Sequence, residues 1–359
     1  MAPPSSNVEF GSESPAGPRP SRAEAGSIEA GGIPPSAPSS PSQPTERPTE
    51  PWHAGLAPRL ITGFLWVAWF DQLAVIGRMD QIGLAYSVGG LALAAILIPF
   101  LWIRRPATWG LTTGRGVFDL ARSTFGVRGV VLVPGIALGC VQIIWLAIAT
   151  TYALEWTLLG LVELGWLRPV VMAPPGAGDR GRDLTYLVSA IVWLLTFALI
   201  GVRALFVRMI AALNQVFPIF AAIAMAVALL WVLMSPRPPS TSEFTGAARS
   251  LPAPWPAPDA SPWDIARDVG GLMQVVLVYG AMMGLAAAEW GRTCRNRSDV
   301  VWGGWIGGTA AALVIGVLAL ATVFLAGLEG AGRQHLSYRA VLTDRIGGIV
   351  GAVLLLVLA

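Results

Sequence analysis

A glutamine and a tryptophan three positions apart, Gln142 and Trp145, stand within a long apolar run. Side chains at positions i and i+3 of a helix are neighbours, so the amide and the indole would share one surface. A ring can stack on a flat molecule while an amide bonds the donors and acceptors at its edge. The pair therefore suits a small planar ligand. The alternative is structural, because glutamine also bonds across membrane helices and tryptophan packs in cores.

Asp71 and Gln72 interrupt a second apolar run, residues 60–77. A carboxylate at membrane depth is costly and usually faces a cavity or a partner, which predicts a cation-binding or gating role for Asp71. Transporters that break their first helix bind cation and substrate at the break, which makes Gln72 a candidate substrate contact. No glycine lies at Asp71 to favour unwinding, so Asp71 could instead mark the interfacial end of a shorter span.

The composition of the chain indicates that these residues lie in a membrane. Hydrophobic residues make up 54% of the 359 residues and charged residues 13%, and the mean hydropathy is +0.63, well above that of a soluble domain. Runs of about 20 apolar residues predict membrane helices. We expect about eight spans, near residues 60–77, 82–103, 129–157, 184–202, 207–234, 269–289, 301–327 and 346–359.

Polar segments flank and separate these spans. The connector 104–128 carries five arginines against one acid, Asp119, so the positive-inside rule puts it and the N-terminus in the cytoplasm. Residues 1–52, rich in Pro, Ser, Gly and Glu, are expected to be disordered, as a solvated tail or the product of a mistaken start codon. Residues 53–359 would form the membrane domain, with an exposed linker at 235–267.

Other classes of protein find little support. The net charge is only +3, and the arginines lie between apolar spans instead of on one basic face, so no nucleic-acid partner is expected. His53 and His335 lie in predicted extramembrane segments without a nucleophile–base pattern, so neither an enzyme nor a cofactor is expected. Cys140 and Cys294 lack metal-ligand spacing and are most simply packing cysteines.

Two separated blocks of sequence follow the pattern of one family of membrane proteins. The first block holds GLTT from Gly110, LARSTFGVRG from Leu120 and GCVQIIW from Gly139. The second is AAAEWGRTCRNR from Ala286, with Glu289 where the family carries aspartate. In this order and hydrophobic context, the two blocks resemble the cytosine permease branch of the nucleobase:cation symporter-1 family.

The resemblance implies an all-α integral membrane protein with the LeuT-like inverted-repeat transporter fold. It also implies that Trp145 stacks on a nucleobase and that Gln142 bonds the edge of that base. Family members have roughly twelve membrane helices, and a polar patch on the eighth helps to bind cation and substrate. The eighth predicted span ends at Ala359 before such residues occur. We therefore expect an incomplete fold, C-terminally truncated, with about 8 of 12 helices.

The sixth predicted span adds further candidates. Family members place an aromatic residue there as the second wall around the base, and counting back from Arg292 puts this position at Gly280, beside Tyr279. Glycines along the span permit a discontinuous helix near these two residues. We expect both to contact substrate, with ordinary packing as the alternative for Tyr279. Glu289 and Arg292 are three residues apart and are expected to form an ion pair or gate at the cytoplasmic end.

Two functions are compatible with these features. The first is a secondary active transporter of the cell membrane that imports cytosine or a related planar heterocycle together with a cation, Na+ or H+, by alternating access. The second is a non-transporting truncated remnant or membrane scaffold of the same family. A channel is not favoured, because polar residues within the spans are isolated.

Overall fold

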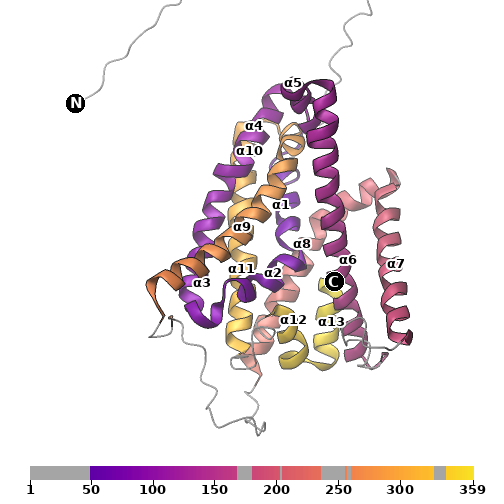
Figure 1. The fold of residues 1–359 in the computed structure, drawn as a ribbon, viewed down its shortest axis with the longest axis vertical. Coiled ribbons are helices and arrows are strands. Elements are labelled where there is room, and N and C mark those ends of the chain that lie inside the picture. Colours follow the sequence, from indigo (N-terminus) through magenta and orange to yellow (C-terminus); the bar gives the residue numbers. More distant parts are fainter. Residues whose placement is uncertain (1–48, 168–179, 203, 236–254, 257–259, 327–336) are drawn as a thin grey trace, which may run out of the picture. The chain divides into compact units, whose positions relative to one another are not determined.

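The protein, seen in a computed structural model, is helical throughout the residues that the structure describes, 49–167, 180–202, 204–235, 255–256, 260–326 and 337–359. Within these ranges no strand forms, and one isolated bridge joins Glu50 to Cys294. Segments labelled η are π-helical and continue directly from the preceding α-helix. The elements are, in chain order (Figure 1), α1 Leu56–Phe64, α2 Val67–Ile76, α3 Met79–Ile98, η1 Pro99–Ile103, α4 Arg104–Thr113, α5 Val117–Val130, η2 Val131–Ala137, α6 Leu138–Glu163, α7 Arg180–Val202, α8 Ala204–Met234, α9 Pro262–Gly291, α10 Arg297–Gly303, η4 Gly304–Ala310, α11 Ala311–Ala326, α12 Tyr338–Ala340, η6 Val341–Ile346 and α13 Gly348–Leu358.

Parts of the predicted polar segments lie outside the described residues. The predicted disordered tail 1–52 is described only from residue 49, and the linker 235–267 is not described at 236–254 and 257–259. His335 lies outside the described residues as well.

Several helices have the length and apolar composition of membrane spans. Within the described residues five helical runs are long and apolar enough to cross a bilayer, namely Met79–Thr113, Val117–Glu163, Gln215–Met234, Pro262–Gly291 and Arg297–Ala326. The bent pair α1 and α2 would make a sixth span. Helices also form at the predicted spans 184–202 and 346–359, but their apolar parts, Leu184–Leu199 and Gly348–Leu358, are shorter. The chain thus has the architecture of a multi-pass membrane protein.

The first apolar run is a broken helix. α1 and α2 meet at an angle of 51°, and Trp66 between them has an extended backbone with φ −67° and ψ 123°. The break requires no glycine, because Trp66 has a negative φ that any residue can adopt. The N–H of Leu65 donates to Ile61 O and that of Trp66 donates to Gly63 O, so both backbone donors are satisfied. The break expected from the sequence therefore exists, but it precedes Asp71 by more than one helical turn.

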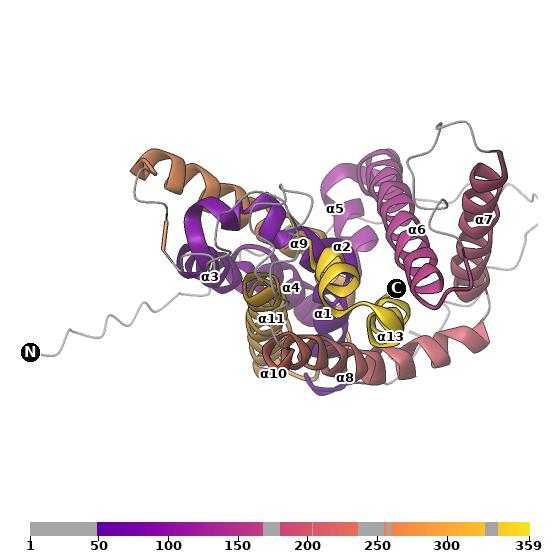
Figure 2. The same ribbon diagram turned by 90° about the horizontal axis from the view of Figure 1, so that it is seen from below.

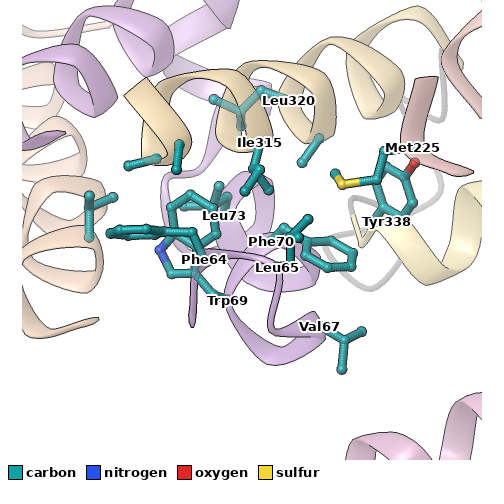
Figure 3. Packing of buried hydrophobic residues seen from close by; sticks show 14 of the residues in the cluster. Phe64, Leu65, Val67, Trp69, Phe70, Leu73, Met225, Ile315, Leu320 and Tyr338 are labelled. Carbon is teal, nitrogen blue, oxygen red and sulfur yellow. The ribbon is translucent and has the colours of Figure 1, made fainter. Parts of the chain in front are cut away.

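The broken helix lies in the centre of the hydrophobic core. Phe64 and Trp69, on either side of the break, pack edge to face with centroids 5.1 Å apart. Figure 3 shows the side chains of this segment lying beneath Ile315 and Leu320 of α11, whose buried face covers them. Figure 2 shows α1 and α2 between α3 and α9 on one side and α6 and α13 on the other, with α7 beyond α6. Both half-helices are thereby packed on several sides.

The segment expected as a polar connector, 104–128, is largely helical. α4 continues from η1, and α5 begins at Val117. The chain turns at Gly114, whose φ of 63° lies in the left-handed region that glycine adopts without steric cost and that often ends helices. Arginine, leucine and alanine favour helix. The many arginines of segment 104–128 are therefore compatible with a helix that extends beyond the membrane span as well as with a loop.

α9 is one helix, and the discontinuity expected near Tyr279 and Gly280 is absent from it. Its glycines serve close packing instead. A Cβ atom at Gly280 would lie 2.7 Å from Ile98 of α3, and one at Gly284 would lie 2.8 Å from the carbonyl oxygen of Trp102 in η1. Small residues four apart allow such close helix contacts within membranes.

Candidate functional site

A cavity of about 410 Å³ opens beside the break in the first helix. This size is within the ~300–1,000 Å³ range of small-molecule sites. We name it the aromatic pocket. Side chains of α1, the break, α6 and the C-terminal half of α9 line it: Arg59, Thr62, Gly63, Trp66, Gln142, Trp145, Tyr279, Met282, Met283, Ala286 and Trp290.

Three of these rings contact one another. The centroids of Trp66 and Trp145 are 4.1 Å apart, those of Trp145 and Tyr279 are 5.1 Å apart with planes at 80°, and those of Trp66 and Tyr279 are 5.8 Å apart. These are contact distances for aromatic pairs. Tyr279 and Trp145 therefore meet edge to face and do not form two parallel walls. A flat ligand would stack on the cluster or separate its rings.

The remaining predicted substrate contacts divide between the pocket and other parts of the molecule. Gln142 is exposed and lines the aromatic pocket on the same face of α6 as Trp145. Gly280 is not among the lining residues, and a Cβ atom there would meet Ile98 of α3. Gln72 is also outside the pocket lining, and its Nε2 donates to Asp71 Oδ2 at 3.0 Å.

The two sequence blocks quoted above meet at one helix contact. A Cβ atom at Gly110 of α4 would overlap the backbone of Ala288 in α9, and one at Gly291 of α9 would overlap the backbone of Ala107 in α4. Glu289, beside Ala288, lies against Gly116 at the start of α5. The glycines of these blocks thus permit backbone contact between α4 and α9 next to the aromatic pocket.

Glu289 and Arg292 form the ion pair that their spacing predicts. Arg292 Nε lies 2.8 Å from Glu289 Oε2, one turn along α9. The side chains are 45% and 33% exposed, so the pair contributes at most about 1 kcal/mol. It lies at the end of α9 that carries Trp290 of the aromatic pocket, and neither of its members lines the pocket.

A polar network lies on the α2 side of the break. Asp71, only 1% exposed, accepts a hydrogen bond from the backbone N–H of Arg339 in α12 at 2.8 Å. The guanidinium of Arg339 forms an ion pair with Glu155 of α6. Tyr186 of α7 donates to the other oxygen of Glu155 at 3.4 Å. Asp71, Glu155 and Arg339, which we name the α12 latch, thus join α12 to α2 and α6.

Apolar contacts reinforce the α12 latch. Tyr338, the neighbour of Arg339, is buried with its ring 5.3 Å from that of Phe70 in an edge-to-face contact. Phe70 in turn packs on Trp156 of α6 at 5.9 Å. Figure 3 shows Tyr338 facing Phe70, with Met225 of α8 beside it. The buried position of Asp71 is therefore accounted for by these partners.

Three residues that the sequence analysis did not single out belong to these sites. Trp66 is one of the tryptophans of an apolar run, so its sequence context does not mark it as a ligand contact. The break in the helix places its side chain in the pocket. Glu155 could have been found, because it is an isolated acid in the long apolar run of α6. Arg339 lies in a polar stretch where an arginine is unremarkable, so its role depends on the fold.

The described residues contain no group of three or more His, Cys, Asp or Glu side chains that could hold a metal ion. A cation held by backbone carbonyls would not require such a group. Comparison of the chain with protein-family models, with curated proteins and with solved structures finds no match.

Proposed function

We propose that the protein is a secondary transporter that binds a nucleobase-like planar heterocycle in the aromatic pocket and moves it with a cation across the membrane. The observation that carries this proposal is the meeting of Trp66, Gln142, Trp145 and Tyr279 around one cavity beside a broken membrane helix. Broken helices border substrate sites in transporters. The resemblance of the two sequence blocks to cytosine permeases supports the same ligand class.

The lining favours a flat ligand of low charge. Its aromatic rings and methionines offer apolar surface for stacking, and Gln142 offers both a donor and an acceptor. The charged member of the lining, Arg59, forms an ion pair with Glu50 at 3.1 Å. A neutral heterocycle with hydrogen-bonding edges would satisfy these groups without bringing an unpaired charge into the pocket.

The positions of the pocket and the α12 latch support alternating access. The pocket uses α1 and the N-terminal half of α6, whereas the latch uses α2, α12 and a later turn of α6. α12 lies near one end of the helix group and α4, α5 and α10 near the other (Figure 1). The break is thus open through a cavity on one side and closed by an ion pair on the other. This is the arrangement expected of a transporter that is open to one side of the membrane.

We assign the end with α4, α5 and α10 to the cytoplasm. Arg292 and Arg295 at this end pair with Glu289 and Asp299. Six further arginines there make no ion pair in the described part of the chain, and they are Arg104, Arg105, Arg115, Arg122, Arg128 and Arg297. At the opposite end Arg78 and Arg267 both lie within 3.4 Å of Asp268. Unpaired arginines at one side fit the positive-inside rule. The conformation seen would then be open to the cytoplasm.

Asp71 is our candidate for the coupling step. It is a buried carboxylate that accepts hydrogen bonds from two neutral donors, the Arg339 N–H and Gln72. The nearby Arg339 guanidinium is shared with Glu155, so one positive charge stands against two carboxylates, and a proton or a sodium ion would compensate the remaining charge. Binding there would alter the contact between α2 and α12. Coupling by way of Asp71 would therefore connect the cation to the α12 latch.

A second function, a non-transporting membrane scaffold, is favoured by the contacts between the rings. Trp66, Trp145 and Tyr279 lie at the distances of packed aromatic residues. In a scaffold these rings would join α6 and α9 to the broken helix permanently. The two functions differ in one testable property. Only in a transporter would a heterocycle bind and replace the contacts between these rings.

Binding and uptake by the full chain separate the two functions. The first measurement is quenching of tryptophan fluorescence by cytosine, uracil, hydantoin, allantoin and hypoxanthine on the protein in nanodiscs. The second is uptake of labelled cytosine by cells that lack their own permease, with and without a sodium or proton gradient. Saturable binding and gradient-dependent uptake support the transporter. The absence of binding by every compound would overturn it and leave the scaffold.

A further inference from the structure

A second hollow, of about 980 Å³, lies at the end of the molecule where α3 and η1 continue into α4. We name it the arginine hollow. None of the described residues that line it is acidic. The lining side chains come from η1, α4 and the first residue of α10, and they are Phe100, Leu101, Arg104, Arg105, Thr108, Trp109, Thr112 and Arg297.

Three guanidinium groups point to an anionic ligand. Arg104, Arg105 and Arg297 are exposed, and in the described part of the chain none of them makes an ion pair. Their neighbours differ, since Arg292 pairs with Glu289 at 2.8 Å and Arg295 with Asp299 at 3.2 Å. Like charges that share one concave surface repel one another, and an anion between them relieves that repulsion.

The chemistry of the lining favours phosphate over a carboxylate or a halide. Guanidinium groups bind phosphate oxygens through two parallel hydrogen bonds each. A phosphodiester between Arg104 and Arg297 would join α4 to α10, which lie side by side (Figure 1). The hydroxyl of Thr108 lies in the same lining and adds a neutral donor.

The apolar surface next to the arginines favours a lipid phosphate over a soluble phosphate as the ligand. Leu101 and Trp109 of the lining are 49% and 60% exposed, and exposed tryptophans are typical of the membrane–water boundary. A small adjoining cavity shares Phe100 and Arg104 with the arginine hollow, and its other lining residues are Pro99, Val300, Val301, Gly304 and Trp305. The charged surface thus continues into an apolar surface along η1 and η4.

We propose that the arginine hollow binds the phosphate headgroup of an anionic phospholipid, with the acyl chains along η1 and η4. Basic pockets between membrane helices on the cytoplasmic side bind such headgroups in other proteins. The lipid stabilises the contact between α4 and α10. Because α4 also packs against α9 through Gly110 and Gly291, occupancy of the hollow supports the wall of the aromatic pocket without entering it.

The test compares two triple variants of the full chain. In the first, Arg104→Gln, Arg105→Gln and Arg297→Gln remove the three charges of the hollow. In the matched control, Arg115→Gln, Arg122→Gln and Arg128→Gln remove three exposed arginines that do not line it. Each protein is reconstituted in nanodiscs of phosphatidylcholine with or without phosphatidylglycerol. Thermal unfolding and native mass spectrometry of retained lipid are then measured.

We expect phosphatidylglycerol to raise the unfolding temperature of the native chain and of the control, with retained lipid in the mass spectrum. In the hollow variant, affinity for that lipid should fall by roughly tenfold or more, while its unfolding temperature in pure phosphatidylcholine stays that of the native chain. Equal lipid effects in both triple variants would overturn the proposal. So would full stabilisation of the native chain by inorganic phosphate or glycerol phosphate, which would indicate a site for soluble anions.

Discussion

The indole of Trp66 lies 4.1 Å from that of Trp145, between centroids, with the two planes tilted by 49°. Trp66 owes this position to its extended backbone between α1 and α2, and Trp145 belongs to the uninterrupted helix α6. The contact therefore couples the geometry of the break to a ring that we expect to bind substrate. A ligand that stacks on Trp145 must contact Trp66 or displace it.

Replacement of Trp145 by alanine should weaken cytosine binding. Loss of an aromatic stacking surface costs about 1–3 kcal/mol per base, which corresponds to roughly 5- to 150-fold in affinity. The measurement is the dissociation constant from titration calorimetry in nanodiscs. The control is Trp302→Ala, since Trp302 is 54% exposed and does not line the aromatic pocket. Equal affinities of the two variants would refute a stacking role for Trp145.

Replacement of Gln142 by alanine should have a smaller effect on the same constant. One neutral hydrogen bond contributes about 0.5–1.5 kcal/mol, or roughly 2- to 12-fold in affinity. Gln274→Ala serves as the control, because Gln274 is an exposed glutamine of α9 outside the pocket lining. A larger loss for Gln274→Ala than for Gln142→Ala would contradict our assignment of the edge contact.

The common surface of Gln142 and Trp145 could be predicted from the sequence because it depends on one property, the helical period within an unbroken run. The pairing of Glu289 with Arg292 follows from the same local rule. Neither prediction requires knowledge of the tertiary fold. Tyr279 follows instead from the resemblance to cytosine permeases, and its place in the pocket depends on how α9 packs against α1 and α6.

The position of the break could not be predicted, because its cause is tertiary. The break at Trp66 involves no glycine or proline, and it is held by the packing of Phe64 and Trp69 against the core. Gly280 shows the converse case. A glycine that permits a break also permits close packing, and only the proximity of Ile98 decides between these roles.

Breaking the α12 latch should close the aromatic pocket on the arginine-rich side. Glu155→Gln removes the charge opposite Arg339, and loss of about 1 kcal/mol from this pair would shift the populations of the two open states by about fivefold. The reporter is Thr62→Cys in the pocket, with Cys140 and Cys294 replaced by serine. We expect slower labelling by a membrane-impermeant maleimide added on that side of oriented vesicles.

The matched control for the latch is Asp264→Asn. It breaks the exposed ion pair between Asp264 and Arg267, which are 3.2 Å apart at the beginning of α9. This change should leave the labelling rate of the reporter unaltered. Faster labelling in Glu155→Gln, or equal slowing by Asp264→Asn, would show that the α12 latch does not control access to the pocket.

Replacement of Asp71 by asparagine should preserve the fold but abolish cation coupling. Asparagine still offers an oxygen to the N–H of Arg339, and the amide of Gln72 can turn to accept from it. Alanine instead leaves the buried N–H of Arg339 without its acceptor, at a cost of about 1–3 kcal/mol. We expect uptake by Asp71→Asn to be independent of the cation gradient. Gradient-driven uptake at the native rate would exclude Asp71 from coupling.

The contact between α4 and α9 should not tolerate a methyl group. A Cβ atom at Gly291 would lie 2.5 Å from Cα of Ala107, so Gly291→Ala must move backbone and should cost about 1–3 kcal/mol. Gly270→Ala, on the same helix with nothing within 4 Å of its Cβ, should be neutral or stabilising by up to about 1 kcal/mol. Unfolding temperatures in detergent measure both. Equal temperatures would mean that α4 and α9 are further apart.

Cys294, between α9 and α10, should react slowly with thiol reagents. Its burial, together with the nearby Asp299 carboxylate, raises the pKa of the thiol to about 11, against about 8.5 for an ordinary cysteine. Only the thiolate reacts, so labelling should accelerate about tenfold per pH unit between pH 8 and 10. Both chains carry Cys140→Ser, because Cys140 is exposed. The reference is Ser298→Cys with Cys294→Ser, an exposed thiol on α10, whose labelling should level off near pH 9. Matching pH profiles would show that Cys294 is not buried.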